Sequence, residues 1–274
     1  MRLAAARNLA KAWLLVLILC AFLGAIGWAI GGYRTASLFG FCALLAAAAV
    51  YAYADRALLG MLGAREYALA EDPRLGSTVG VLAAKLGILP PKLYLIDDGF
   101  PRAFVAGRGP RGSALALSTG LLLALPPAEL EGVLAHELAH VRSRDVLVQT
   151  FAAMLAVMLI ETSRIGGFLE RTLLAVLGPT ASAFVHILLS PKRELAADRV
   201  AAGICGSPHG LSDALLRLDQ ASDLVSFAAN PATEPLYTVN PFAEEGLAAL
   251  FVTHPPIGDR VARLRALESI SAAA

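Results

Sequence analysis

Charged residues are scarce in this 274-residue chain: only 16% are Asp, Glu, Lys or Arg, while 57% are hydrophobic. The mean hydropathy is +0.64. Soluble domains carry about 25% charged residues, so this deficit favours a membrane protein over one large soluble core. The net charge of +1 provides no electrostatic basis for binding nucleic acid, and we expect none as a partner.

Cysteine and histidine are also rare, with three and five residues respectively. Cys20, Cys42 and Cys205 have no metal-ligand spacing, and two of them lie in apolar runs. This argues against a disulfide framework and against a cysteine zinc site. A zinc site in this chain must therefore use histidine and carboxylate ligands.

Two of the five histidines flank a glutamate in the sequence His136-Glu137-Leu138-Ala139-His140. Histidines four positions apart lie one helical turn apart, so both imidazoles can face one metal ion. Glu137 is offset around the helix and can reach a water molecule beside the metal without ligating it. This is the arrangement of a zinc hydrolase. The alternative is a surface helix that carries two titrating histidines.

A catalytic zinc ion needs a third protein ligand and one position open to water. Glu194 is the best candidate, and we expect one zinc ion per chain. Asp198 follows four residues later on the same helix face. It would accept a hydrogen bond from the outer nitrogen of a ligand histidine, His136 being the expected partner. By spacing alone, a solvated acidic helix face fits this segment equally well.

Two uncharged runs, residues 12–30 and 37–54, are each long enough to cross a bilayer as a helix. With residues 31–36 as a tight loop, they predict a transmembrane hairpin. Basic residues flank both outer ends while the loop holds only Arg34, so the positive-inside rule places both termini in the cytoplasm. A cleaved signal peptide is the competing interpretation of the first run.

Two more apolar stretches, residues 146–160 and 173–189, predict a second helical hairpin. Each is a span, a re-entrant segment or a helix buried against the rest of the protein; we favour membrane insertion. His186 in the second stretch is expected to be packed or hydrogen-bonded, not a metal ligand.

The remaining segments have globular composition. We expect helices at 66–86, 192–202, 211–218 and 255–267, strands at 92–96, 103–105 and 114–118, and a loop-like stretch at 221–248. The strand of Ala114, Leu115, Ala116, Leu117 and Ser118 is a candidate exposed edge beside the metal, to which a peptide substrate could add as a further strand.

The chain thus divides into four segments: an N-terminal transmembrane hairpin (1–55), a first catalytic part with the HExxH helix (56–145), a second hydrophobic hairpin (146–190), and a second catalytic part with the third zinc ligand and a C-terminal helix (191–274). The predicted fold class is α+β and mainly helical. It combines a zincin-like HExxH catalytic domain, containing a small antiparallel or mixed sheet, with two transmembrane helical hairpins.

Several separated motifs carry a family resemblance that runs from about residue 59 to residue 267. They are Asp72-Pro73-Arg74-Leu75, Ala103-Phe104-Val105-Ala106-Gly107, Ser118-Thr119-Gly120-Leu121-Leu122, Glu131 to Glu137, Arg193-Glu194 with Ala197-Asp198, and Thr253-His254-Pro255-Pro256 with Arg260. With these motifs in this order, the chain resembles the HtpX-like membrane zinc metallopeptidases, distant relatives of the CAAX prenyl proteases.

The resemblance implies that Glu194 is the third zinc ligand. It also implies that His254 and Arg260 lie at the active site, where they help to bind substrate and to stabilise the oxyanion. Without the resemblance, these two residues would simply belong to a capped, arginine-bearing terminal helix.

The chain departs from the family pattern at two places. Arg102 stands where the family usually has asparagine before Ala-Phe, which puts a substrate-backbone contact in doubt. Pro191 replaces the first arginine of Ser-Arg-x-Arg-Glu, and proline there is expected to mark the start of a helix. Neither change removes a ligand.

These features predict a zinc-dependent endopeptidase, multi-pass in the inner (plasma) membrane, with its catalytic domain at the cytoplasmic face of the lipid bilayer. Glu137 would act as general base. The expected substrates are polypeptides, membrane or misfolded proteins, and the resemblance implies a role in protein quality control. Bilayer tethering would raise the local concentration of such targets. The sequence does not indicate an oligomeric state.

Two other classes of function are weighed against this prediction. A catalytically idle membrane scaffold or chaperone would hold a structural zinc ion, but closed structural sites use four protein ligands and the sequence offers no fourth candidate. A transporter or pore would place charged residues within its spans, and the first two runs contain none.

Overall fold

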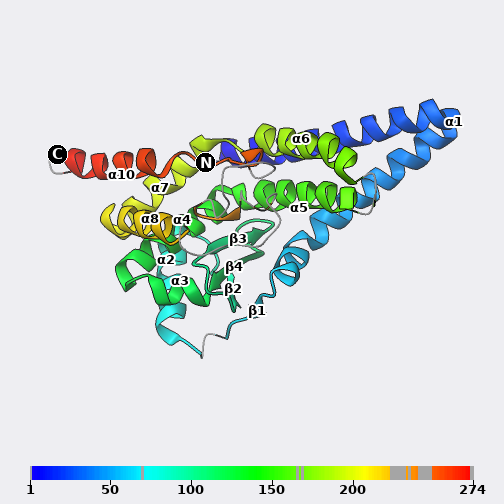
Figure 1. The fold of residues 1–274 in the computed structure, drawn as a ribbon. Helices are drawn as coiled ribbons and strands as arrows, with labels where there is room; N and C mark the ends of the chain where they lie inside the picture. The colour runs from blue at the N-terminus through cyan, green and yellow to red at the C-terminus, as the bar shows by residue number, and fades with distance from the viewer. Residues whose placement is uncertain are drawn as a thin grey trace.

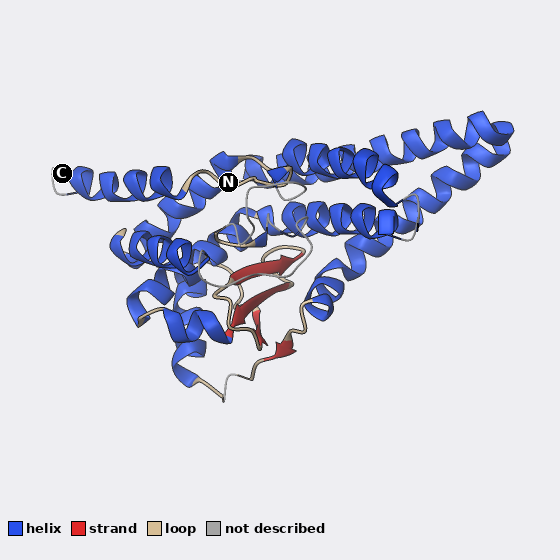
Figure 2. Ribbon diagram, in the orientation of Figure 1, coloured by secondary structure: helices blue, strands red, loops and turns tan. Residues whose placement is uncertain are grey.

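The computed structural model describes residues 2–68, 71–164, 170–222, 236–239 and 249–271, together with residues 167 and 233. Figures 1 and 2 show a mainly helical protein with one small sheet, from which long helices extend to one side. This confirms the prediction of a mainly helical fold with a small mixed sheet. Most of the predicted loop at 221–248 lies outside the described residues.

Helix α1 (Arg2–Met61) folds back on itself and forms a hairpin (Figure 1). The reversal is at Gly31 and Gly32, inside the predicted loop; Gly32 has a φ of 70°, which favours glycine. At Gly27 a Cβ atom would lie 2.7 Å from the carbonyl oxygen of Thr35, so a larger residue would force the two arms apart. Gly27–Met61 is the one helical stretch of the described chain that is long and apolar enough to cross a membrane. Two transmembrane hairpins therefore stay a prediction.

A second antiparallel helix pair consists of α5 (Asp145–Arg164) and α6 (Glu170–Leu188), which lie side by side and pack against α1 (Figure 1). The buried core that joins the three helices includes Val50, Phe151 and Val185. The His186 ring nitrogen Nε2 lies 3.0 Å from the Leu250 carbonyl oxygen, which confirms that this histidine is hydrogen-bonded.

The sheet contains β1 (Arg65–Glu66), β2 (Lys92–Ile96), β3 (Ala103–Gly107) and β4 (Ser113–Ser118), in the order β1-β2-β4-β3. β2 and β4 run parallel, and the other neighbours are antiparallel. The three predicted strands are confirmed. The prediction that Ala114, Leu115, Ala116, Leu117 and Ser118 form an exposed edge is wrong: β2 and β3 pair with both sides of β4, and all five residues are buried. The outer strand near the HExxH helix is β3.

Helix α2 (Pro73–Leu86) begins seven residues later than predicted. The side chain of Asp72 accepts hydrogen bonds from the backbone amides of Arg74 and Leu75 and so caps the helix. The preceding Arg65–Glu66 pairs with β2 instead, because β2 would otherwise be an open edge.

Helix α4 (Pro127–Ser143), which follows the short α3 (Thr119–Ala124), lies at the centre of the globular part. α7 (Pro191–Cys205) and α8 (His209–Ser222) pack on α4, and α10 (Ile257–Ser271) packs on α7 and α8. Gly132 allows a close approach of α4 and α8: a Cβ atom there would lie 2.5 Å from the backbone nitrogen of Leu211 on α8. Residues before and after the second helix pair thus share one core.

Candidate metal centre

Helix α4 brings both histidines of the HExxH motif to its buried face. His136 and His140 are each 1% exposed. Their Nε2 atoms lie 3.3 Å apart, and their rings meet edge to face with centroids 4.9 Å apart. The helix starts at Pro127, and proline is well suited to that position because the first turn needs no amide donor.

Helix α7 supplies the acidic member of the cluster, Glu194, which is 2% exposed. Pro191 begins this helix, as predicted, and Ser190 caps it. The Oε2 atom of Glu194 lies 3.3 Å from His136 Nε2 and 3.5 Å from His140 Nε2. Its other oxygen, Oε1, accepts a hydrogen bond from the Arg193 guanidinium at 3.1 Å.

His136 Nε2, His140 Nε2 and Glu194 Oε2 form a triangle whose sides have the lengths expected for three ligands of a tetrahedral zinc ion. Ligands about 2.0–2.1 Å from such an ion lie about 3.3–3.4 Å from one another, and the observed separations are 3.3, 3.3 and 3.5 Å. Two imidazole nitrogens and one carboxylate oxygen are also a donor set that zinc hydrolases use. His136, His140 and Glu194 therefore form a buried cluster that could bind a metal ion.

The outer nitrogens of both histidines face carboxylates. His136 Nδ1 lies 2.9 Å from an oxygen of Asp198, the partner expected from the sequence. His140 Nδ1 lies 3.7 Å from an oxygen of Asp145. Sequence reasoning missed Asp145 because it lies beyond the end of α4, where Arg144 adopts a left-handed conformation with φ 61° and turns the chain back. The only signal was an acid five residues after the second histidine.

Arg260 on α10 is fully buried, with 0% exposure. Its Nε and Nη2 atoms donate to the two oxygens of Asp198 at 2.9 and 2.7 Å, and Nη1 donates to the Thr238 carbonyl oxygen at 2.6 Å. Burial by itself raises the pKa of Asp198, but the Arg260 guanidinium overrides burial and brings the pKa down to about 2. Arg260 thus holds the carboxylate that contacts His136.

Glu137 lies beside the cluster and is 2% exposed. Its Oε1 atom accepts a hydrogen bond of 2.6 Å from the Thr238 hydroxyl. Burial raises the pKa of Glu137, while His136, His140 and the Thr238 hydrogen bond oppose that rise. Burial also acts to raise the pKa of Glu194, but His140 and His254 hold it well below its usual range. Thr238 carries no motif, so the sequence contained no signal for it.

The other predicted site residues have clear places. His254 Nε2 lies 3.7 Å from Glu194 Oε2, so this histidine does reach the cluster. Ser118 serves the fold, because its hydroxyl accepts from the Arg102 and Leu121 amides and donates to the Phe100 carbonyl. The unusual Arg102 is buried and forms an ion pair of 2.6 Å with Asp98.

Replacing Arg260 with leucine is expected to destabilise the protein by about 3–5 kcal/mol, because the Asp198 carboxylate would remain buried without its ion-pair partner. Thermal unfolding of the detergent-solubilised protein measures the effect. Arg263→Leu, an exposed position on the same helix, is the matched control and should change stability by less than about 0.5 kcal/mol. Equal unfolding midpoints for the two variants would contradict the role assigned to Arg260.

The chain is similar to known proteins over most of its length. Residues 69–268 match peptidase family M48. A protease HtpX homolog of Pelotomaculum thermopropionicum is 40% identical over 278 residues, covering 95% of this chain and 99% of the relative. One of Acidiphilium cryptum is 42% identical over 279 residues, covering 94% and 96%. The crystal structure of S. mikatae Ste24p aligns with a TM-score of 0.51 at 17% identity, covering 96% of this chain and 66% of that one, which shows likeness of fold.

Proposed function

This chain belongs to peptidase family M48 and is a membrane-associated metalloprotease, and from that premise we propose that it is an endopeptidase that uses one zinc ion to cleave membrane or misfolded proteins at the cytoplasmic face of the plasma membrane. The observation that carries the proposal is the triangle of His136, His140 and Glu194 atoms, with the carboxylate of Glu137 beside it. The quality-control role rests on the resemblance to HtpX-like proteins.

Glu137 moves the proton in the reaction we propose. When bound, zinc supplies Lewis acidity, which polarises the scissile carbonyl and makes water easier to deprotonate. Glu137 accepts the proton of the attacking water and then delivers it to the leaving amine. Its pKa is raised by burial, which suits a carboxylate that must act first as a base and then as an acid.

The remaining polar residues orient the reacting groups. Asp198 and Asp145 face the outer nitrogens of the histidines, so both Nε2 atoms are aimed at the ligand cluster. Arg260 has its guanidinium engaged by Asp198 and Thr238. We therefore assign Arg260 to positioning instead of direct contact with the oxyanion. His254 is the residue we assign to the oxyanion, because it reaches the cluster.

We place the substrate along β3, which is the outer strand of the sheet and contacts α4, although all five of its residues are buried in the free protein. An extended peptide can add to such an edge through its main chain, largely independent of side-chain identity. Residues 236–239 now lie against this strand: the Thr238 hydroxyl is 3.4 Å from the Ala103 carbonyl oxygen, and the Tyr237 ring packs edge-on against Phe104. A bound substrate would exchange the Ala103 contact for its own hydrogen bonds.

Membrane placement follows from the surface of α1. Large apolar side chains along it are more than half exposed, including Trp28, Ile30 and Phe41. Such a surface is stable in lipid and costly in water. The basic residues that flank both outer ends of the hairpin favour a cytoplasmic catalytic domain.

Metal dependence tests the function directly. We expect the detergent-solubilised protein to cleave casein, to lose that activity with a zinc chelator and to regain it when zinc is restored. Cleavage that persists without metal would contradict the zinc mechanism. A zinc-loaded protein that cleaves neither casein nor an unfolded membrane protein would instead support a scaffold with a structural zinc site.

Replacing Thr238 with valine is expected to shift the acid limb of the pH–activity profile to higher pH. The Thr238 hydrogen bond lowers the pKa of Glu137, so its loss raises that pKa further, and the base is ionised only at higher pH. The variant should therefore lose more activity at low pH than at high pH. Thr238→Ser keeps the hydroxyl and should restore the profile; an unchanged profile in Thr238→Val would exclude this role.

A further inference from the structure

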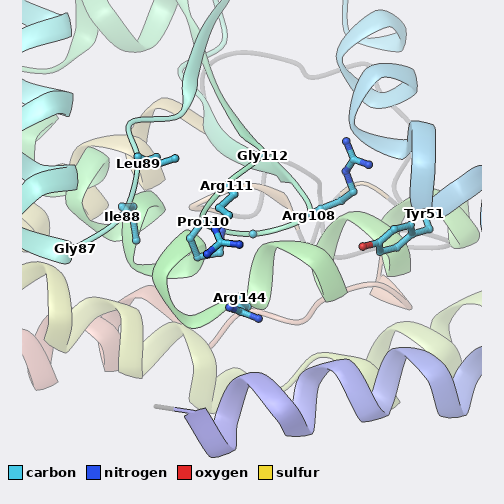
Figure 3. A pocket seen from close by; sticks show the side chains of 10 residues that line it. Tyr51, Gly87, Ile88, Leu89, Arg108, Pro110, Arg111, Gly112 and Arg144 are labelled. Atoms are coloured by element: carbon cyan, nitrogen blue, oxygen red, sulfur yellow. The ribbon is translucent and has the colours of Figure 1, made fainter.

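A cavity of about 950 Å³, whose lining includes no residue of the metal cluster, lies between the second arm of α1, the β3–β4 hairpin turn and the C-terminal end of α4 (Figure 3). Three arginines line it: Arg108 and Arg111 from the hairpin turn, and Arg144 from the end of α4. Tyr51 of α1 also lines the cavity, next to Arg108, whose guanidinium carbon lies 6.0 Å from the centre of the Tyr51 ring.

All three arginines are exposed residues. Within the part of the chain that the structure describes, no carboxylate forms an ion pair with any of them. A smaller neighbouring cavity of about 350 Å³ shares Arg108 and Arg111 and has one acid in its lining, Asp55, beside Arg56 and Lys92. Cations gathered on a concave surface with so little compensating charge favour an anionic ligand with several acceptor oxygens.

Arg144 has an unusual backbone conformation, and its side chain lies at the basic cavity. Arg144 is the only residue other than glycine with a positive φ in the described chain, and it occupies a helix-end position where glycine or asparagine is usual. Its Cγ atom lies 3.7 Å from where a Cβ atom of Gly109 would stand, so the helix end and the hairpin turn meet at the cavity. Strained backbone conformations are often found at functional sites, and this one places the Arg144 side chain at the cavity.

An apolar groove lies next to the basic cavity and shares Tyr51 with it. It has a volume of about 390 Å³ and is lined by side chains of both arms of α1 and of α5, among them Trp13, Leu44 and Phe151. Tyr51 lines both the groove and the basic cavity. A small cavity lined by Tyr51, Arg108 and Phe151 lies between them. This intervening cavity has a volume of only about 10 Å³, so the basic cavity and the apolar groove are two neighbouring hollows on either side of Tyr51.

We propose that the groove and the basic cavity together bind an anionic membrane phospholipid. Arg108, Arg111 and Arg144 bind the phosphate, and the acyl chains occupy the groove beside Trp13. This rests on the membrane placement in the proposed function. Because Arg144 lies four residues after His140, a lipid held there fixes the height of the metal cluster above the bilayer surface.

The test uses the tryptophan in the groove. The chain has two tryptophans, so Trp28→Phe leaves Trp13 as the only one. We expect phosphatidylglycerol with brominated acyl chains to quench Trp13 fluorescence in detergent at a mole fraction about tenfold or more below that of brominated phosphatidylcholine, as three arginines near an anionic headgroup should give. Equal quenching by the two lipids overturns the proposal.

Two triple variants, each of which removes three positive charges, distinguish binding at this site from nonspecific electrostatic attraction to the protein. Arg108→Gln/Arg111→Gln/Arg144→Gln should abolish the preference for phosphatidylglycerol, and Arg111→Gln alone, an exposed position, should weaken it. Arg74→Gln/Arg199→Gln/Arg263→Gln, at exposed positions that line neither cavity, should leave it intact. A preference that survives the first variant, or is lost equally in both, overturns the site.

Inorganic phosphate distinguishes the source of the anion. At equal ionic strength, phosphate and chloride should reduce quenching to the same small extent; selective displacement of the lipid by phosphate would show a site for the free ion and overturn the lipid proposal. The fluorescence readout needs no peptidase activity. A protein that cleaves nothing but shows the preference therefore contradicts the proposed function alone, whereas an active protein without the preference contradicts only the lipid site.

Discussion

The Glu137→Gln variant is expected to hydrolyse peptide bonds about 10²–10⁴-fold more slowly than the unmodified protein, while still binding one zinc ion per chain. Glutamine keeps the size of the side chain and can accept the Thr238 hydrogen bond, but it cannot take a proton from water. Glu137 contributes no ligand atom to the cluster, so metal content should not change. We therefore predict that the variant loses activity without losing zinc.

Initial rates of casein cleavage and zinc analysis of the same preparation measure both quantities. Glu131→Gln is the matched control, because it makes the same chemical change six residues earlier on α4 and outside the cluster. It should retain full activity. Normal turnover in Glu137→Gln would show that another group takes the proton, and loss of zinc would show that Glu137 also holds the metal.

The Glu194→Ala variant is expected to lose both zinc and activity. Its carboxylate supplies one of only three ligand atoms in the cluster, and it comes from a different helix than the other two. Without it, only two imidazoles would remain in a buried site, and a divalent ion there would lose its single anionic ligand. Adding zinc should not rescue cleavage at concentrations that fully load the unmodified protein.

Asp198→Asn should have a smaller effect than Glu194→Ala. Asp198 contacts the outer nitrogen of His136 and supplies no ligand atom itself. We expect its zinc affinity to fall about 10–100-fold, with activity recovered in excess zinc. Lys192→Ala, exposed in the first turn of the same helix as Glu194, should bind zinc normally. Full zinc occupancy in Glu194→Ala would mean that a different group completes the site.

Local chemistry made much of this molecule predictable. The four-residue spacing of His136 and His140 requires only a helix to place both rings on one side, and proline at position 127 suits the first turn of that helix. Pro191 and Ser190 likewise define the start of the helix that carries Glu194. Strands 92–96, 103–105 and 114–118 were recognised because turn residues separate short apolar runs. In each case the decisive interactions lie within a few residues of one another.

Features that depend on contacts between distant segments could not be predicted from local sequence. In the sheet, β4 is an inner strand and β3 an outer one. Which strands pair depends on how distant parts of the chain come together in the fold. Asp145 and Thr238 reach the cluster only through a chain reversal and a long-range approach. The sequence by itself determined the ligand types and the helices that carry them. Only the tertiary structure decided what surrounds them, since contacts between residues 101 and 135 positions apart along the chain leave no periodicity to read.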